Sequence, residues 1–172
     1  VMDRKSGEQK VFEADSRFTK NVVEKCESGN YEQWERHNIE NPHFYDLMYL
    51  PQTGMYARLH LGGIEFDATR DILNLMDDRD LYLTFFDKDF VVVGEAKLPS
   101  HRYNYFTGWR ETNDGVALFV DNSLDENEKT EELVLDIVRL HLFVRLVLSR
   151  ITLRLITQRY HCNFRPCPEA ER

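Results

Sequence analysis

Cysteine is scarce in this sequence, with three residues, Cys26, Cys162 and Cys167, among 172. An odd number of thiols cannot pair completely within one chain, which argues against a small domain stapled by disulfides. The sequence also lacks an apolar N-terminal stretch of the signal-peptide kind and any Asn-x-Ser/Thr acceptor. We therefore expect a reducing compartment, cytoplasmic or nuclear.

Positive charge is also in short supply. The chain has 22 Lys and Arg against 30 Asp and Glu, a formal net charge of -8. An acidic protein repels phosphate backbones and anionic headgroups, so this balance argues against sequence-independent binding of nucleic acid or of a membrane surface.

Long apolar runs free of charge are missing as well. The most apolar stretch, residues 133–156, contains Asp136 and four arginines, Arg139, Arg145, Arg150 and Arg154. Charged side chains are costly in a bilayer, so this stretch is not expected to span a membrane.

The composition that remains is typical of one globular domain. Hydrophobic residues make up 42% and charged residues 30% of the chain, enough for a single core of substantial size. We expect a flexible N-terminal segment at residues 1–14, one α+β domain at residues 15–160 and a flexible tail at residues 161–172.

Residues 80–97 show the clearest local pattern. Two runs rich in aromatic and β-branched residues flank the polar turn Asp87-Lys88-Asp89. Strand-like runs separated by a short turn-forming cluster predict a β-hairpin.

Similar patterns predict further elements along the chain. Pro51 and Gly54 lie in a turn cluster that favours a second hairpin. Asn30 is expected to cap a short helical turn that carries Tyr31 and Trp34. We expect strands at residues 44–50, 55–61, 64–66, 103–106 and 116–120, and helices at residues 15–26 and 72–76.

The C-terminal third predicts a long helix. Ser123 to Glu126 forms a capping-box pattern, and apolar residues from Leu133 to Val144 would cover most of a helix surface. Past Ser149 the apolar residues alternate, so helix and strand both stay open there. The expected fold is α+β: a curved, mainly antiparallel sheet packed on a long C-terminal helix, with small N-terminal helices.

Asp80, Glu95 and Lys97 form a candidate catalytic pattern. Many metal-dependent nucleases place an Asp at the start of one strand and Glu-x-Lys on its hairpin partner. The two carboxylates, Asp80 and Glu95, would hold Mg²⁺ or Mn²⁺, and Lys97 would stabilise charge on the phosphate. A solvated ion pair at the strand ends is the commoner meaning of such a short motif.

A second pattern is a family resemblance. Arg58-Leu59-His60, followed by Gly63-Ile64-Glu65-Phe66-Asp67-Ala68-Thr69, resembles a motif of TIP41-like proteins, and residues 143–161 resemble their Arg-rich C-terminal segment. The resemblance covers about a fifth of the chain. It implies a non-enzymatic, β-rich fold that binds a type 2A phosphatase catalytic subunit.

A third pattern is an aromatic cluster with flanking arginines. Aromatic residues and Arg are enriched at the energetic centres of protein interfaces, although a packed sheet face is the commoner explanation. The candidate binding residues are Arg102, Tyr103, Tyr105, Trp109 and Arg110.

These patterns favour a non-enzymatic, intracellular protein-binding or regulatory module that needs no cofactor. A phosphatase catalytic subunit is its possible partner. The alternative function is a Mg²⁺- or Mn²⁺-dependent nuclease that uses Asp80, Glu95 and Lys97, and nucleic acid would be a partner only in that case.

Overall fold

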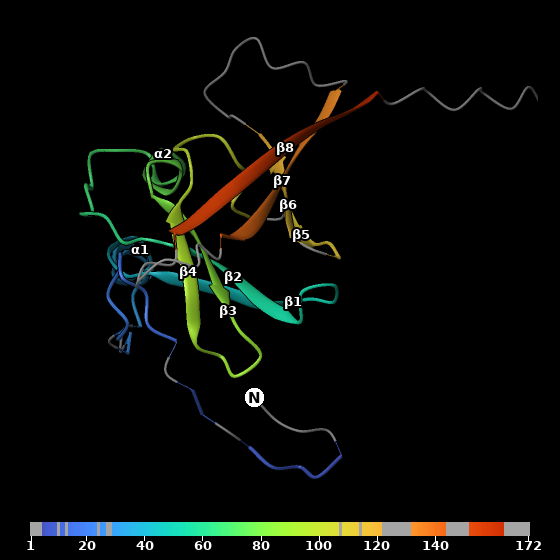
Figure 1. Ribbon diagram of the computed structural model, residues 1–172. Helices are drawn as coiled ribbons and strands as arrows, with labels where there is room; N and C mark the ends of the chain where they lie inside the picture. The colour runs from blue at the N-terminus through green and yellow to red at the C-terminus, as the bar shows by residue number, and fades with distance from the viewer. Residues whose placement is uncertain are drawn as a thin grey trace, which may run out of the picture.

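A computed structural model describes residues 5–9, 11–12, 14–23, 25–26, 29–106, 108–113, 115–121, 132–143 and 152–163. These residues form two four-stranded antiparallel sheets and two short helices (Figure 1). Neither of the described helices is long and apolar enough to cross a membrane.

The first sheet is a meander in which each strand pairs with the next in sequence. Its strand order is β1-β2-β3-β4. The strands are β1 (His43–Leu50), β2 (Met55–Leu61), β3 (Leu81–Phe86) and β4 (Val92–Lys97). Both hairpins expected from the sequence are confirmed, with turns at residues 51–54 and 87–91.

The second sheet repeats this arrangement with the order β5-β6-β7-β8. Its strands are β5 (Trp109–Glu111), β6 (Val116–Val120), β7 (Glu132–Phe143) and β8 (Thr152–Asn163). The strand expected at residues 103–106 is reduced to one bridge between Tyr103 and Val120. Residues 64–66 form no strand.

The long C-terminal helix and the α+β class that depended on it are wrong. Residues 132–143 are β7, paired with β8 along its whole length, so the structure is mostly antiparallel sheet. An apolar run is typical of a buried helix and also of a strand with apolar groups on both faces. In β7, Val134, Val138 and Leu140 face one way while Leu135 and Ile137 face the other. The capping box at residues 123–126 lies outside the described residues.

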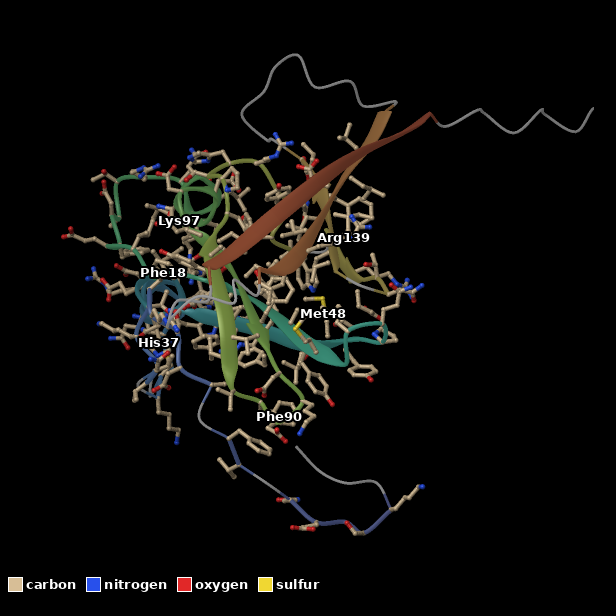
Figure 2. The ribbon with its side chains drawn as sticks, viewed as in Figure 1. Phe18, His37, Met48, Phe90, Lys97 and Arg139 are labelled. Carbon is tan, nitrogen blue, oxygen red and sulfur yellow. The ribbon has the colours of Figure 1, made fainter. Side chains whose placement is uncertain are left out.

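The core lies between the two sheets. Alternate residues of the first sheet, including Leu59 and Leu83, pack with Val116 and Leu118 of β6 and Val138 of β7. The Met48 side chain lies in this layer, between β1 and the second sheet (Figure 2). The sheets come close where their first strands meet, and the rings of Tyr45 on β1 and Trp109 on β5 have centroids 4.4 Å apart.

The helices lie to one side of the first sheet, on the left in Figure 1. Helix α1 (Tyr31–Glu40) begins at Asn30, whose side chain accepts a hydrogen bond from the Glu32 N–H, as the sequence predicted. Helix α2 (Ile72–Asp77) begins at Asp71, which accepts the Leu73 N–H in the same way.

The helix expected from Asp15 or Ser16 onward is wrong. The Ser16 hydroxyl accepts hydrogen bonds from the Phe18 and Thr19 N–H groups, and the described residues from 14 to 23 contain no helix. A Ser that satisfies nearby backbone donors caps a turn as readily as a helix. This N-terminal segment lies on the outer face of the first sheet, where Phe18 stacks on Tyr82.

Candidate functional site

Asp80 and Lys97 meet at one end of the β3–β4 hairpin. The Lys97 Nζ lies 2.7 Å from Asp80 Oδ1, and the Tyr82 hydroxyl donates to Asp80 Oδ2 at 3.3 Å. Lys97 and the turn residue Phe90 mark opposite ends of this hairpin in Figure 2. This geometry is the strand-end ion pair that the sequence offered as the commoner meaning of the motif.

Glu95 belongs to a different, buried cluster on the same face. Its side chain is 1% exposed. Glu95 Oε2 accepts the backbone N–H of Arg17 at 2.7 Å, and Oε1 accepts the Thr84 hydroxyl at 3.2 Å. The N-terminal segment therefore covers this carboxylate and uses it as a hydrogen-bond acceptor.

His60 completes the buried cluster. Its Nε2 lies 3.6 Å from Glu95 Oε1, its ring stacks on Tyr82, and the side chain is fully buried. Neither ring nitrogen donates or accepts a hydrogen bond among the described residues. Burial lowers the pKa of His60 to about 4, despite the opposing effect of Glu95, so the ring is neutral at physiological pH.

The nuclease alternative requires a metal held by Asp80 and Glu95. In the structure, Asp80 forms an ion pair with Lys97. Glu95 instead accepts hydrogen bonds from the Thr84 hydroxyl and the Arg17 backbone N–H. Within the described part of the chain, no three His, Cys, Asp or Glu side chains gather in a way that would hold a metal ion. The nuclease remains a prediction from the sequence pattern.

Arg102 and Tyr103 of the predicted binding cluster bind an internal carboxylate. The Arg102 Nε and one terminal nitrogen lie 2.9 and 2.7 Å from Asp136 Oδ2, and the Tyr103 hydroxyl donates to the same oxygen at 2.9 Å. Burial raises the pKa of Tyr103 to about 12. These contacts join the 102–103 loop to β7.

The remaining residues of that cluster have separate surroundings. Tyr105 packs against the core, and Arg110 on β5 is exposed. Trp109 is half-buried against Tyr45. The structure therefore divides the five predicted binding residues between an internal ion pair, the core edge and the surface.

Trp109 lines a large apolar groove. This groove, which we call the α1 groove, has a volume of about 740 Å³. Its walls come from α1, α2, the start of β1, Phe106 and Trp109, and include Trp34, Ile39, Ile72 and Met76. A volume of this size is within the range of ligand-binding pockets.

The rim of the α1 groove is aromatic and accessible. Tyr31 and Phe106 are among the most exposed large apolar side chains of the described residues, and Trp34 is 50% exposed. Tyr31 and Trp34 stack with ring centroids 5.7 Å apart because they lie three residues apart on α1. Exposed apolar side chains clustered around a groove are typical of a binding surface.

A buried cation, Arg79, lies at the base of the groove. Arg79 is 4% exposed and lies between α2 and β3. Its Nε donates to the Gly62 carbonyl at 2.8 Å, and a terminal nitrogen donates to the Asn41 carbonyl at 2.7 Å. No carboxylate among the described residues forms an ion pair with it, and burial lowers its pKa.

Tyr45 and His43 also line the groove, and the Arg79 charge affects the pKa of both. Burial raises the pKa of Tyr45 to about 12, while Arg79 opposes that rise. Burial lowers the pKa of His43, and Arg79 lowers it further. The groove therefore combines apolar walls with a positive, hydrogen-bond-donating base.

Sequence reasoning missed Arg79 as a functional candidate. Arg79 follows Asp77 and Asp78, a context typical of a solvated charged turn. The only available signal was its position one residue before the Asp80 hairpin entry, and that position does not indicate burial. The residues carrying the TIP41-like resemblance lie on β2, where Arg58 and His60 are buried or half-buried, and in the 63–69 loop.

Comparisons with known proteins show a likeness of fold. No family model and no curated protein matches the sequence. A solved structure that is similar is the crystal structure of a member of the DUF4221 family from Bacteroides vulgatus, with a TM-score of 0.51 and 15% sequence identity. The match covers 72% of this chain and 30% of that protein, so this chain spans less than a third of its length.

Proposed function

We propose that this chain is a non-enzymatic binding module that holds a protein partner in the α1 groove. The observation that carries the proposal is the groove itself, an apolar cavity of about 740 Å³ with Trp34 and Trp109 in its walls. Trp, Tyr and Arg are the residues that most often dominate binding energy at protein interfaces. All three types occur here, in Trp34, Tyr31 and Arg79.

Pre-organisation of the groove supports this function. Helix α1 is capped by Asn30, and the Ile64 N–H donates to the Ile39 carbonyl at 3.0 Å, which ties the end of α1 to the loop after β2. Arg79 joins the same loop to the residue after α1 through Gly62 and Asn41. Walls held in this way lose little conformational entropy when a partner binds.

The test is a selection from a displayed random-peptide library against the purified chain. We expect enriched peptides whose affinity falls at least about tenfold in a Trp34→Ala variant, as for a central interface aromatic. The matched control is Tyr49→Ala, because Tyr49 on β1 is 49% exposed, close to the 50% of Trp34, and lies outside the groove. Equal binding by Trp34→Ala and the parent chain would overturn the proposal.

The phosphatase catalytic subunit implied by the TIP41-like resemblance is one specific partner that the same variants test. Binding of a purified type 2A catalytic subunit to the parent chain and to Tyr49→Ala, with loss in Trp34→Ala, is the result expected for that partner. Binding unaffected by Trp34→Ala would place that partner elsewhere on the surface.

A further inference from the structure

The charge of Arg79 carries an inference about the partner's chemistry, and this inference depends on the proposed binding function. A buried cation is normally paired with an anion, because removing a charge from water carries a large desolvation cost. Arg79 is 4% exposed, and its side chain contacts two backbone carbonyls and, at 3.6 Å, the Met76 sulfur. The carbonyl oxygens accept hydrogen bonds from part of the Arg79 guanidinium group. They do not provide a counter-ion for its positive charge among the described residues.

A guanidinium has five N–H groups, and the three contacts of Arg79 leave further donors. The Tyr45 hydroxyl lies within electrostatic range of Arg79 and lines the same groove. Two donors at one apolar base are suited to a carboxylate, which accepts bonds at both oxygens.

We infer that the α1 groove binds the C-terminus of a partner protein, with the terminal carboxylate on Arg79 and Tyr45 and the last apolar side chain against Ile72 and Met76. A terminal residue carries its carboxylate and its side chain on one Cα, so both can enter a single cavity. An internal Glu or Asp is followed as well as preceded by peptide chain, so the groove would have to let the partner's chain leave in two directions. Glu35 also lines the groove, on α1, so an additional acidic side chain on the ligand would meet a like charge.

Fluorescence reports this binding directly because the chain has two tryptophans, and Trp34 and Trp109 both line the groove. The probe is N-acetyl-leucyl-leucine, which does not fluoresce, titrated beside its C-terminal amide. The chain's net charge of -8 repels the acid more than the amide. Tighter binding of the acid therefore requires local hydrogen-bond donors or a local cation that overcome this repulsion.

We expect saturable quenching or enhancement with the acid and at least about tenfold weaker binding of the amide, as for a lost charge-assisted hydrogen bond. Tyr45→Phe keeps the ring against Trp109. It should weaken binding of the acid by about tenfold and leave binding of the amide unchanged. Arg79→Lys keeps the positive charge but loses the planar guanidinium group that can donate two parallel hydrogen bonds. This variant should also bind the acid more weakly. Arg110→Gln is the control, since Arg110 is exposed and outside the groove.

Three outcomes would overturn the inference. They are equal binding of acid and amide, no binding of either, and tighter binding of an internal-acid probe, N-acetyl-leucyl-glutamyl-leucine amide. Thermal unfolding of each variant shows whether it is folded, and Tyr45→Phe keeps the test valid if Arg79→Lys does not fold. Equal binding of acid and amide would leave the proposed binding function standing, whereas Trp34→Ala without effect on selected peptides would remove it.

Discussion

Two buried charged side chains, Asp136 and Arg79, are satisfied in opposite ways. Asp136 is 1% exposed and has Arg102 and the Tyr103 hydroxyl as partners. Arg79 has carbonyl oxygens and a sulfur. The first arrangement is complete within the chain and stabilises the fold, whereas the second leaves a charge that a ligand can neutralise.

Replacing the Asp136 carboxylate tests the completed arrangement. Asp136→Asn removes the negative charge that Arg102 and Tyr103 contact, so we expect the free energy of unfolding to fall by about 1.5–3 kcal/mol. Urea denaturation measures the change. Asp121→Asn is the control, because Asp121 contacts Asn104 at an exposed position and should cost less than about 1 kcal/mol. Equal losses of stability in both variants would contradict a stabilising role for the Asp136 contacts with Arg102 and Tyr103.

His60 predicts how stability depends on pH. The unfolded chain protonates this ring as pH falls through about 6.5, whereas the folded chain resists protonation until about pH 4. The stability present above pH 6.5 is therefore lost on acidification, by about 3 kcal/mol across this window. Glu95 and Arg58 are the charged groups that act on the ring, and they remain in a His60→Gln variant. That variant should show a flatter dependence of unfolding free energy on pH, and parallel curves would refute the prediction.

At the scale of elements, hairpins were predictable and the C-terminal third was not. Residues 55–61 and 116–120 form strands with the expected bounds, because each short apolar run is bounded by turn-forming residues, such as Gly54 and Gly115. In β7 the apolar run satisfies helix and strand patterns alike. The strand is formed by pairing with β6 and β8, and its Asp136 contacts Arg102, which is 34 residues away in sequence. A local pattern contains no information about such a pairing.

The contact between α1 and the loop after β2 predicts the effect of one methyl group. A Cβ at Gly63 would collide with the carbonyl oxygen of Glu40, at the end of α1. We expect Gly63→Ala to lower the free energy of unfolding by about 1–3 kcal/mol, as for overpacking against backbone. Thermal or urea unfolding measures it.

Gly29→Ala is the matched control for this position. Its added methyl group meets nothing within 4 Å, and Gly29 precedes the same helix. A Gly63→Ala variant as stable as Gly29→Ala would show that α1 does not approach the loop as described.

For the whole molecule, the two sheets share one core and should unfold together. Leu118 of β6 is fully buried in the layer that also contains Leu59 and Leu83 of the first sheet. Leu118→Ala should lower the free energy of unfolding by about 2–5 kcal/mol through lost contacts and a cavity. The loss should appear in a single transition seen by circular dichroism and by fluorescence. Leu73→Ala, at a position that is 67% exposed, should change little, and two separate transitions would contradict a shared core.

The α1 groove forms only when elements distant in sequence pack together in the whole molecule. This explains why the sequence predicted some of its residues but missed the site. Trp109 was a candidate from its aromatic neighbours, and Trp34 was placed on a helical face. Arg79 looked like a solvated charge because its burial depends on Asn41 and Gly62, which lie 38 and 17 residues away. Only the packing of α1 and α2 beside the two sheets brings these residues to one cavity.

The most direct measurement of the central claim is a ¹H–¹⁵N spectrum of the two indole N–H groups during a titration with a peptide selected by the chain. Both tryptophans line the α1 groove, so both indole signals should shift together and saturate at the same peptide concentration. In Trp34→Ala the remaining Trp109 signal should shift only at much higher concentration. If neither indole signal moves while the peptide binds, the α1 groove is not the binding site.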